Sequence, residues 1–202
     1  MRAVTATVMA AVWVWGGVTG RYLPEGDPQK ALVMGLEPGG TLTMLGAPVG
    51  TWRCAAACRE IFIASPLEGK GEKRYRVFRN DGRYLGLERE GEKHLYRRLD
   101  TKDLPKRNAV SGLEGRWRLT PERGVTLKIE FVLPDVFRYE RRESREESLE
   151  KGEGEWYYDP KTRRLIVSAF GSELAGESTV RVEKNRAVFK KRERVLEAER
   201  EK

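Results

Sequence analysis

Cys54 and Cys58 are the residues whose type and spacing most clearly allow chemistry, and three alanines separate them. An internal repeat aligns Trp52 with Trp156, and the three alanines then correspond to the turn at 159–161. The cysteines would flank a three-residue hairpin loop and face each other across it. Opposed positions on antiparallel strands have Cα atoms about 4.5–5.5 Å apart, which is within disulfide range. This pattern predicts a hairpin-tip disulfide in an oxidising compartment.

Two alternatives for the cysteine pair stay open on the sequence alone. The thiols could be inert, or they could cycle their redox state or bind a soft metal such as copper or zinc. A metal site needs a third ligand, and His94 is the only histidine in the chain. Nothing in the sequence brings His94 to the hairpin, and its place beside Leu95 and Tyr96 is typical of an ordinary strand residue.

Sequence support for catalysis is weak. The chain has no Gly-x-Ser-x-Gly elbow, no phosphate-binding glycine loop and no His-Glu-x-x-His pair. With a single histidine, a general base would have to be His94 or a carboxylate whose pKa is raised. We therefore assign no catalytic residue and expect no cofactor, and the sequence leaves open whether the chain is an enzyme.

The elements that position these residues repeat along the chain. Gly20-Arg21-Tyr22 corresponds to Gly115-Arg116-Trp117, and Gly50-Thr51-Trp52 corresponds to Gly154-Glu155-Trp156. The spacing between copies drifts from about 95 to about 105 residues, which loop insertions explain. Repetition at this length predicts two tandem modules.

Alternation of apolar and polar residues dominates both copies and predicts short strands joined by hairpins. Seven or eight sequential strands form an up-and-down meander that closes on itself and so removes its edges. We therefore predict an all-β chain of two small antiparallel barrels. The expected organisation is a first barrel at 18–100, a linker at 101–112, a second barrel at 113–192 and a short exposed helical tail at 193–202, which is rich in helix formers.

The Gly-x-aromatic openings resemble those of small bacterial lipocalin-like domains. The residues that carry the resemblance are Gly20, Tyr22, Gly50 and Trp52 in the first copy, and Gly115, Trp117, Gly154 and Trp156 in the second. The resemblance implies calycin-type, secreted β-barrels, some of which bind a small apolar ligand.

Large aromatic residues at these positions have two interpretations. They can fill the core of a barrel, or they can line a ligand cavity, since small-molecule sites are mostly apolar with a few polar groups. The cavity candidates are Tyr22, Trp52, Trp117, Phe137 and Trp156.

The N-terminal segment 1–17 has a basic start, about a dozen apolar residues and a small-residue end, as a secretory signal does. Its apolar run is short for a membrane span, which needs about 20 residues. We expect a secreted or periplasmic chain that meets a membrane only through an uncleaved N-terminus or through weak attraction to anionic lipid.

The net charge of +8 is compatible with nucleic-acid binding, but basic and acidic residues alternate in both halves, which favours a solvated surface. No nucleic-acid partner is expected.

A composition rich in charge, with Gln29 as the only glutamine, resembles that of heat-adapted proteins. The mixed-charge run at 141–148 is expected to form an exposed hairpin tip.

The predicted function is non-catalytic binding of a small apolar ligand or an envelope partner. The alternative is an envelope metal or thiol-redox role for Cys54 and Cys58.

Overall fold

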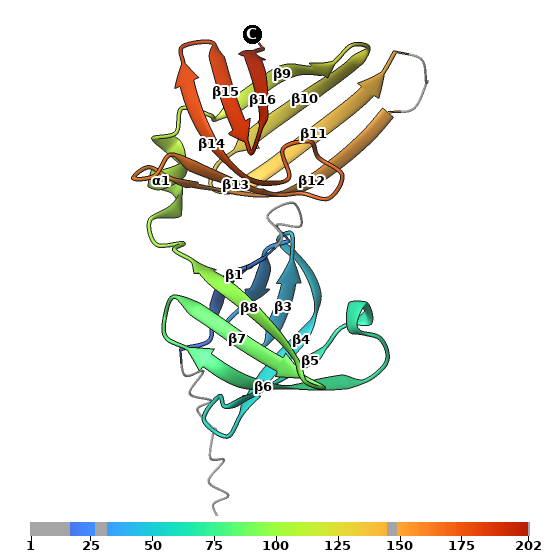
Figure 1. Cartoon of the computed structure of the whole chain (residues 1–202), viewed down its shortest axis with the longest axis vertical. Coiled ribbons are helices and arrows are strands. Elements are labelled where there is room, and N and C mark those ends of the chain that lie inside the picture. The colour runs from blue at the N-terminus through green and yellow to red at the C-terminus, as the bar shows by residue number, and fades with distance from the viewer. Residues whose placement is uncertain (1–16, 27–31, 145–148, 202) are drawn as a thin grey trace, which may run out of the picture.

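The computed structural model describes residues 17–26, 32–144 and 149–201, which form two closed eight-stranded antiparallel barrels in tandem (Figure 1). In each barrel the strands follow one another in chain order, and the last strand pairs with the first. This topology is the closed meander that the period-two pattern predicts. The predicted fold class, all-β with two tandem barrels, is therefore confirmed.

The first barrel, barrel 1, is built from short strands and includes one turn of 3-10 helix, η1. Its elements are β1 (Gly20–Pro24), β2 (Met34–Leu36), β3 (Thr41–Met44), β4 (Ala47–Ala55), β5 (Glu60–Ala64), η1 (Pro66–Glu68), β6 (Glu72–Asn80), β7 (Tyr84–Arg89) and β8 (Glu92–Leu99).

The second barrel, barrel 2, has longer strands. They are β9 (Gly115–Glu122), β10 (Val125–Val132), β11 (Val136–Glu143), β12 (Leu149–Asp159), β13 (Arg164–Ser168), β14 (Gly176–Glu183), β15 (Arg186–Lys191) and β16 (Arg194–Arg200).

The C-terminal segment differs from the sequence prediction, because the expected helical tail at 193–202 is wrong. Its residues form β16, which pairs with β15 and with β9 and so closes barrel 2. Leu196 and Ala198 point into the core while their neighbours are exposed. Barrel closure overrides the helix propensity of this segment, because without β16 the strands β15 and β9 would both have unpaired edges.

The linker between the barrels contains the α-helix of the described residues, α1 (Leu104–Ala109). Asn108 in this helix is fully buried. Its side-chain amide donates to the carbonyls of Pro134 and Trp156, at 2.5 and 3.1 Å, and its side-chain oxygen accepts from the Tyr158 backbone N–H at 2.9 Å. The linker helix is thereby fixed to barrel 2.

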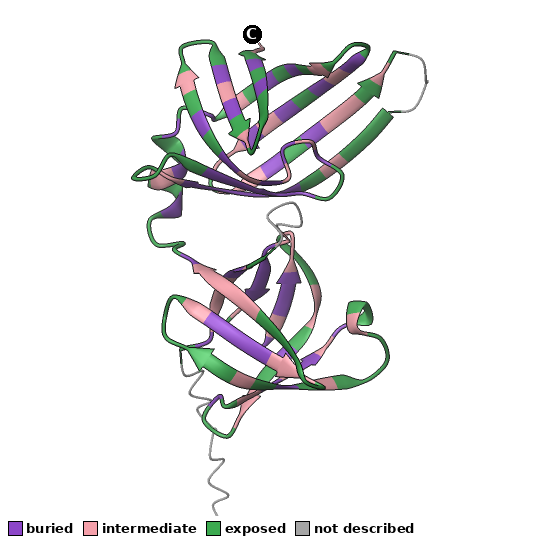
Figure 2. Cartoon of the chain, in the orientation of Figure 1, coloured by how far each residue is buried: buried purple, intermediate pink, exposed green. Residues whose placement is uncertain are grey.

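The core of each barrel is made by inward-facing residues, which alternate with exposed residues along the strands, as the purple bands in Figure 2 show. Glycine permits close packing at one repeated position. A Cβ on Gly50 would lie 2.2 Å from the Ala64 carbonyl oxygen, and one on Gly154 would lie 2.0 Å from that of Ser168. The repeated glycine therefore allows β4 to approach β5, and β12 to approach β13, more closely than a side chain would permit.

The two barrels also contact each other through a cluster of charged groups around Arg21 in β1. The Arg21 guanidinium forms an ion pair with Glu155, donates to the Tyr157 hydroxyl at 2.9 Å and pairs with Glu37 at 3.0 Å. The carboxylate of Asp135 lies 3.7 Å from the same guanidinium. We call this set of five residues the junction cluster.

Burial shifts the pKa values of the junction cluster. Burial raises the pKa of Asp135, which the nearby Arg21 opposes and Glu37 reinforces. Burial also raises the pKa of the Tyr157 hydroxyl, so that it stays neutral. Beside the cluster, the Val33 N–H donates to the Ser168 hydroxyl at 2.8 Å, so the junction combines charged and neutral contacts.

Candidate functional site

The five aromatic cavity candidates all lie inside the barrels. Tyr22 and Trp52 belong to the core of barrel 1, whereas Trp117, Phe137 and Trp156 belong to that of barrel 2. Each is at most 3% exposed. The structure places them among packed core side chains.

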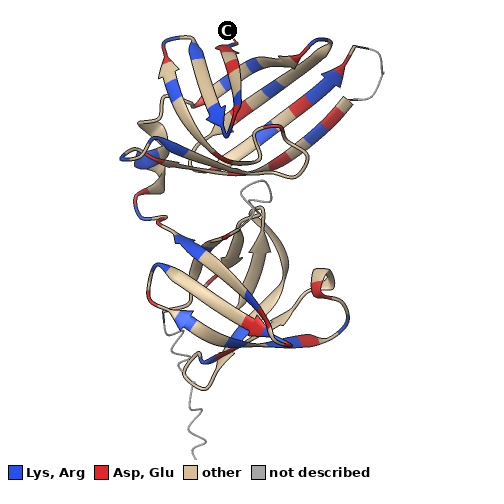
Figure 3. Cartoon of the chain, in the orientation of Figure 1, with Lys and Arg blue, Asp and Glu red and all other residues tan. Residues whose placement is uncertain are grey.

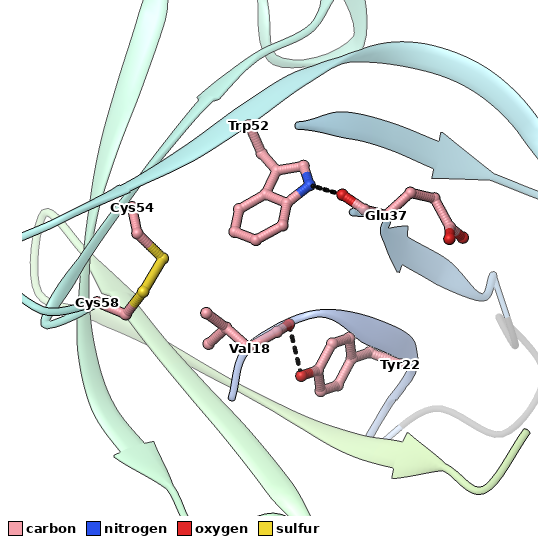
Figure 4. Close-up of a disulfide and its surroundings, with 6 residues drawn as sticks. All are labelled: Val18, Tyr22, Glu37, Trp52, Cys54 and Cys58. Atoms are coloured by element: carbon pink, nitrogen blue, oxygen red, sulfur yellow. Dashed lines mark hydrogen bonds between the residues drawn. A yellow bond between two sulfur atoms is a disulfide. The ribbon is translucent and has the colours of Figure 1, made fainter. Parts of the chain in front are cut away.

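The polar ends of these aromatic residues bind backbone carbonyls. The Tyr22 hydroxyl donates to the Val18 carbonyl at 2.8 Å, and the Trp52 indole N–H donates to that of Glu37 at 3.0 Å (Figure 4). Burial raises the pKa of Tyr22, although Arg98 acts in the opposite direction. Both polar atoms are thus satisfied within the fold.

Barrel 2 repeats this arrangement with a larger aromatic core. The indole of Trp117 donates to the Leu113 carbonyl at 2.6 Å, and that of Trp156 donates to the Val132 carbonyl at 3.1 Å. The Phe131 ring lies 5.2 Å from the Phe137 ring and 5.0 Å from that of Trp156, measured between centroids. These contacts fill the interior around Phe131 with protein side chains.

Two arginines that the sequence reasoning missed cover the ends of the barrels. Arg98 in β8 donates to the carbonyls of Gly17 and Thr19, and its guanidinium lies 5.9 Å from the Tyr22 ring centre. Arg200 in β16 is the equivalent residue in barrel 2, and it lies 4.3 Å from the ring centre of Trp117. Their partners are backbone carbonyls and ring faces, which a sequence does not display. The sequence offers one signal for these two arginines, which is that a basic residue lies near the end of each repeat.

The predicted disulfide between Cys54 and Cys58 is confirmed, with the Cα atoms 4.7 Å apart. The expected cross-strand geometry is wrong, because Cys54 is paired in register with Ile61. Cys58 instead lies within the turn, where Ala56, Ala57 and Cys58 all have positive φ of 50–61°. This left-handed run curls the chain back toward β4 and brings the two sulfur atoms together.

The disulfide lies against the barrel 1 core. Cys58 is 5% exposed and belongs to the same buried cluster as Trp52, and both appear in Figure 4. In barrel 2 the equivalent turn is held by Asp159, whose carboxylate accepts from the Thr162 hydroxyl at 2.8 Å and from the Lys161 N–H at 3.1 Å. The disulfide therefore occupies the position at which the second copy uses side-chain hydrogen bonds.

The structure keeps His94 away from the cysteine hairpin. His94 lies on β8, which pairs with β7 and β1, whereas the cysteines belong to the β4–β5 hairpin. Its side chain is half exposed, 3.7 Å from the carboxylate of Glu92. Among the described residues, no group of three or more His, Cys, Asp or Glu side chains is arranged to hold a metal ion.

An open groove of about 840 Å³ lies at one end of barrel 2. Its apolar lining includes Ala169 and Phe170 from the loop after β13, Leu196 from β16 and Leu32 from barrel 1. Phe170 is 77% exposed, although it is a large apolar residue. An exposed aromatic side chain beside an apolar surface is a feature of binding sites.

Charged side chains complete the lining of this groove. Lys191 is half-buried and donates to the Ala175 carbonyl, and burial lowers the pKa of its ammonium group. In the described part of the chain no carboxylate forms a salt bridge with Lys191, whereas Arg194 pairs with Glu173 at 3.3 Å. The groove therefore combines an apolar surface with a partly desolvated cation.

Two expectations fall on parts of the chain for which no structure is given. The predicted leader, 1–17, lies outside the described residues except for Gly17. The tip of the mixed-charge hairpin, 145–148, also lies outside them, between β11 and β12. Within the described residues, no helix is long and apolar enough to cross a membrane.

Comparison with known proteins gives no family assignment. No family model matches the chain, and no curated protein matches it. Among solved structures, the β chain of DNA polymerase III from Streptococcus pneumoniae aligns over 89% of this chain and 56% of that one, so this chain spans little more than half its length. The identity is 5% and the TM-score 0.17, and this likeness carries no argument about fold or function.

Proposed function

We propose that the chain is a non-catalytic, extracytoplasmic binding protein of lipocalin-like type that takes a small apolar ligand. The observation that supports this proposal best is the groove at the end of barrel 2, with Phe170 exposed at its surface. The proposed site is this groove and not a barrel interior, because the five aromatic cavity candidates lie among packed core side chains.

The chemistry of the groove favours a ligand with an apolar body and an anionic or polar end. Leu32, Phe170 and Leu196 offer apolar surface, and burial of apolar area drives association. The ammonium of Lys191 has two donors left after its bond to the Ala175 carbonyl. A ligand oxygen at this position would accept from the half-buried ammonium in addition to the Ala175 carbonyl.

An oxidising location is supported by the Cys54–Cys58 disulfide, because such bonds persist mainly outside the cytosol. The proposal places the chain in the periplasm or the extracellular space. An envelope protein could use the same exposed Phe170 as its contact, and the mass of the bound species distinguishes this partner from a small ligand.

The alternative function is that of an envelope thiol-redox or metal protein. One observation favours it: both sulfur atoms lie in a single hairpin, so reduction would present two thiols within one turn. Burial of Cys58 restricts access to one of them. Mass spectrometry of the reduced chain with added copper or zinc would detect a stoichiometric adduct that is lost in the Cys54→Ser variant.

Titration with 1-anilinonaphthalene-8-sulfonate, an apolar fluorescent anion, tests the binding proposal. The wild-type chain should bind this probe saturably, and Phe170→Ala should weaken the binding about tenfold through loss of the aromatic contact. Leu67→Ala is the matched control, since Leu67 is a similarly exposed apolar residue on barrel 1. Equal binding by the wild type and Phe170→Ala would contradict the proposed site.

A further inference from the structure

One strand of barrel 2 has a free edge. Strand β12 is paired with β11 from Leu149 to Glu155, but its pairing with β13 begins only at Glu155. Residues 149–154 therefore have a paired strand on one side only, and Figure 1 shows β12 extending beyond β13. The chain after β13 lies near this segment without pairing with it, since a Cβ on Gly154 would meet the Ser168 carbonyl oxygen and one on Gly171 would meet the Glu150 carboxylate. An exposed strand edge is a template for pairing with another strand.

The backbone groups that face this edge belong to odd-numbered residues. The N–H of Trp156 donates to the Asp135 carbonyl, so even-numbered residues of β12 direct their backbone polar groups toward β11. Lys151 and Glu153 consequently direct theirs to the free side. Their side chains lie on the outer face and are 58% and 62% exposed.

Two rows of charged residues cross the outer face of barrel 2 and end at this edge. Figure 3 shows them as blue and red bands on neighbouring strands. The rows follow the strand registers directly. The first row is Arg116, Glu130, Arg138 and Glu153, and the second is Arg118, Lys128, Glu140 and Lys151.

Salt bridges connect most neighbours within the rows. In the first row, Glu130 pairs with Arg116 at 3.0 Å and with Arg138 at 3.4 Å, and Arg138 pairs with Glu153 at 2.9 Å. The first row thus alternates in sign and ends with a carboxylate at the edge. The second row ends with an ammonium, because Lys151 pairs with Glu140 at 2.6 Å.

We propose that this edge pairs with the same edge of a second copy of the chain, across a two-fold axis at Gly152. This register sets Lys151 opposite Glu153 of the second copy, and Glu153 opposite Lys151 of the second copy. Both residues direct their backbone groups to the edge, so each pair can form two backbone hydrogen bonds. The first row of one copy then continues into the second row of the other, and the charges alternate in sign from Arg116 as far as Lys128 of the second copy.

Other registers are less favourable. An axis at Lys151 would place two ammonium groups opposite each other, and an axis at Glu153 would do the same with two carboxylates. Like charges directly opposite each other destabilise a strand pair. An axis between two residues would set odd positions against even ones and misalign the backbone donors. The charges therefore select one antiparallel register.

A lysine alone on an edge strand discourages pairing. Glu153, two residues further on the same face, makes the edge self-complementary for a two-fold-related strand. The paired segment is short, because Glu155 already pairs with Ser168 of β13. The dimer is accordingly a weak, concentration-dependent one.

Charge reversal with sedimentation velocity tests the proposal. The wild-type chain should show a reversible monomer–dimer equilibrium, and Lys151→Glu and Glu153→Lys should each weaken it about tenfold through opposed like charges. An equimolar mixture of the two variants should restore association as a heterodimer. The double variant with both changes should dimerise like the wild type.

Arg181→Glu is the matched control, because Arg181 is an exposed strand residue of barrel 2, on β14, away from the edge. It should leave the equilibrium unchanged, and circular dichroism establishes that every variant is folded. A wild type that stays monomeric as its concentration rises would overturn the proposal. Single variants that associate as well as the wild type, or a mixture that does not associate, would also overturn it.

Discussion

Replacing Arg21 with methionine removes the single guanidinium that the carboxylates of the junction cluster share. Arg21 contacts Glu155, Glu37 and Asp135, and the side chains of Arg21 and Glu155 are 23% and 7% exposed. The second carboxylate oxygen of Glu155 is buried and has no hydrogen-bond partner within the described residues. Without Arg21, the carboxylate of Glu155 would therefore be buried without a counter-charge.

The expected loss follows from the burial of this pair. Removing one partner of a fully buried ion pair costs about 3–5 kcal/mol, and the partial exposure of Arg21 reduces the expected loss to about 2–3 kcal/mol. Glu155→Met should cost less, because Arg21 would keep Glu37 and Asp135 as partners. The double variant should be more stable than Arg21→Met alone, since the most deeply buried carboxylate, that of Glu155, is then removed together with its counter-charge.

Urea unfolding of the full chain, followed by circular dichroism, measures these differences. Arg181→Met is the matched control, because its pair with Glu183 is 74% and 59% exposed and should contribute under about 1 kcal/mol. If Arg21→Met loses no more stability than Arg181→Met, Arg21 is not the shared counter-charge of the junction cluster. A further loss of stability on adding Glu155→Met to Arg21→Met would also refute that role.

Three further predictions concern other parts of the fold. Gly154→Ala should lower the melting temperature well below that of Gly39→Ala, because its Cβ would lie 2.0 Å from the Ser168 carbonyl oxygen. At Gly39 a Cβ would meet no atom, and only the positive φ of 90° would strain the backbone, so equal melting temperatures would contradict this expectation. Asp135→Asn should stabilise the chain at neutral pH, because the pKa of Asp135 is raised in the folded state and the folded wild type therefore loses stability as pH rises through that pKa. Melting temperatures measured from acidic to neutral pH should show the difference between the variant and the wild type widening as pH rises. A difference that narrows with rising pH would contradict this direction. Cys54→Ser should cost about 2 kcal/mol, the entropic value for so short a loop, and reductant should destabilise the wild type equally in calorimetry but leave the variant unchanged.

The fold was largely predictable because its anchors recur in the sequence. Trp52 and Trp156 mark equivalent strands, and the alternating pattern between such anchors reflects one buried and one exposed face. The last strand was not predictable from its own residues. Leu196 and Ala198 supply too little alternation to outweigh the helix formers around them, and only closure against β9 makes the segment a strand.

The candidate site was less predictable than the fold. The spacing of Cys54 and Cys58 was sufficient to predict a bond, but the left-handed turn that brings them together depends on backbone angles that alanine rarely adopts. Phe170 directly follows a run of apolar, strand-forming residues, and only the fold leaves it exposed beside a groove. Arg21 was read as part of a repeated motif, because contacts between barrels do not follow the period of one barrel.

Native mass spectrometry of the full chain exported from a bacterial host tests whether the chain binds a small ligand at the groove of barrel 2. We expect a mass about 2 Da below that of the reduced chain, from one disulfide, together with a small organic adduct. The adduct should be lost in Phe170→Ala and kept in Leu67→Ala. A wild-type chain without an adduct, or an adduct that persists in Phe170→Ala, would contradict ligand binding at the groove of barrel 2.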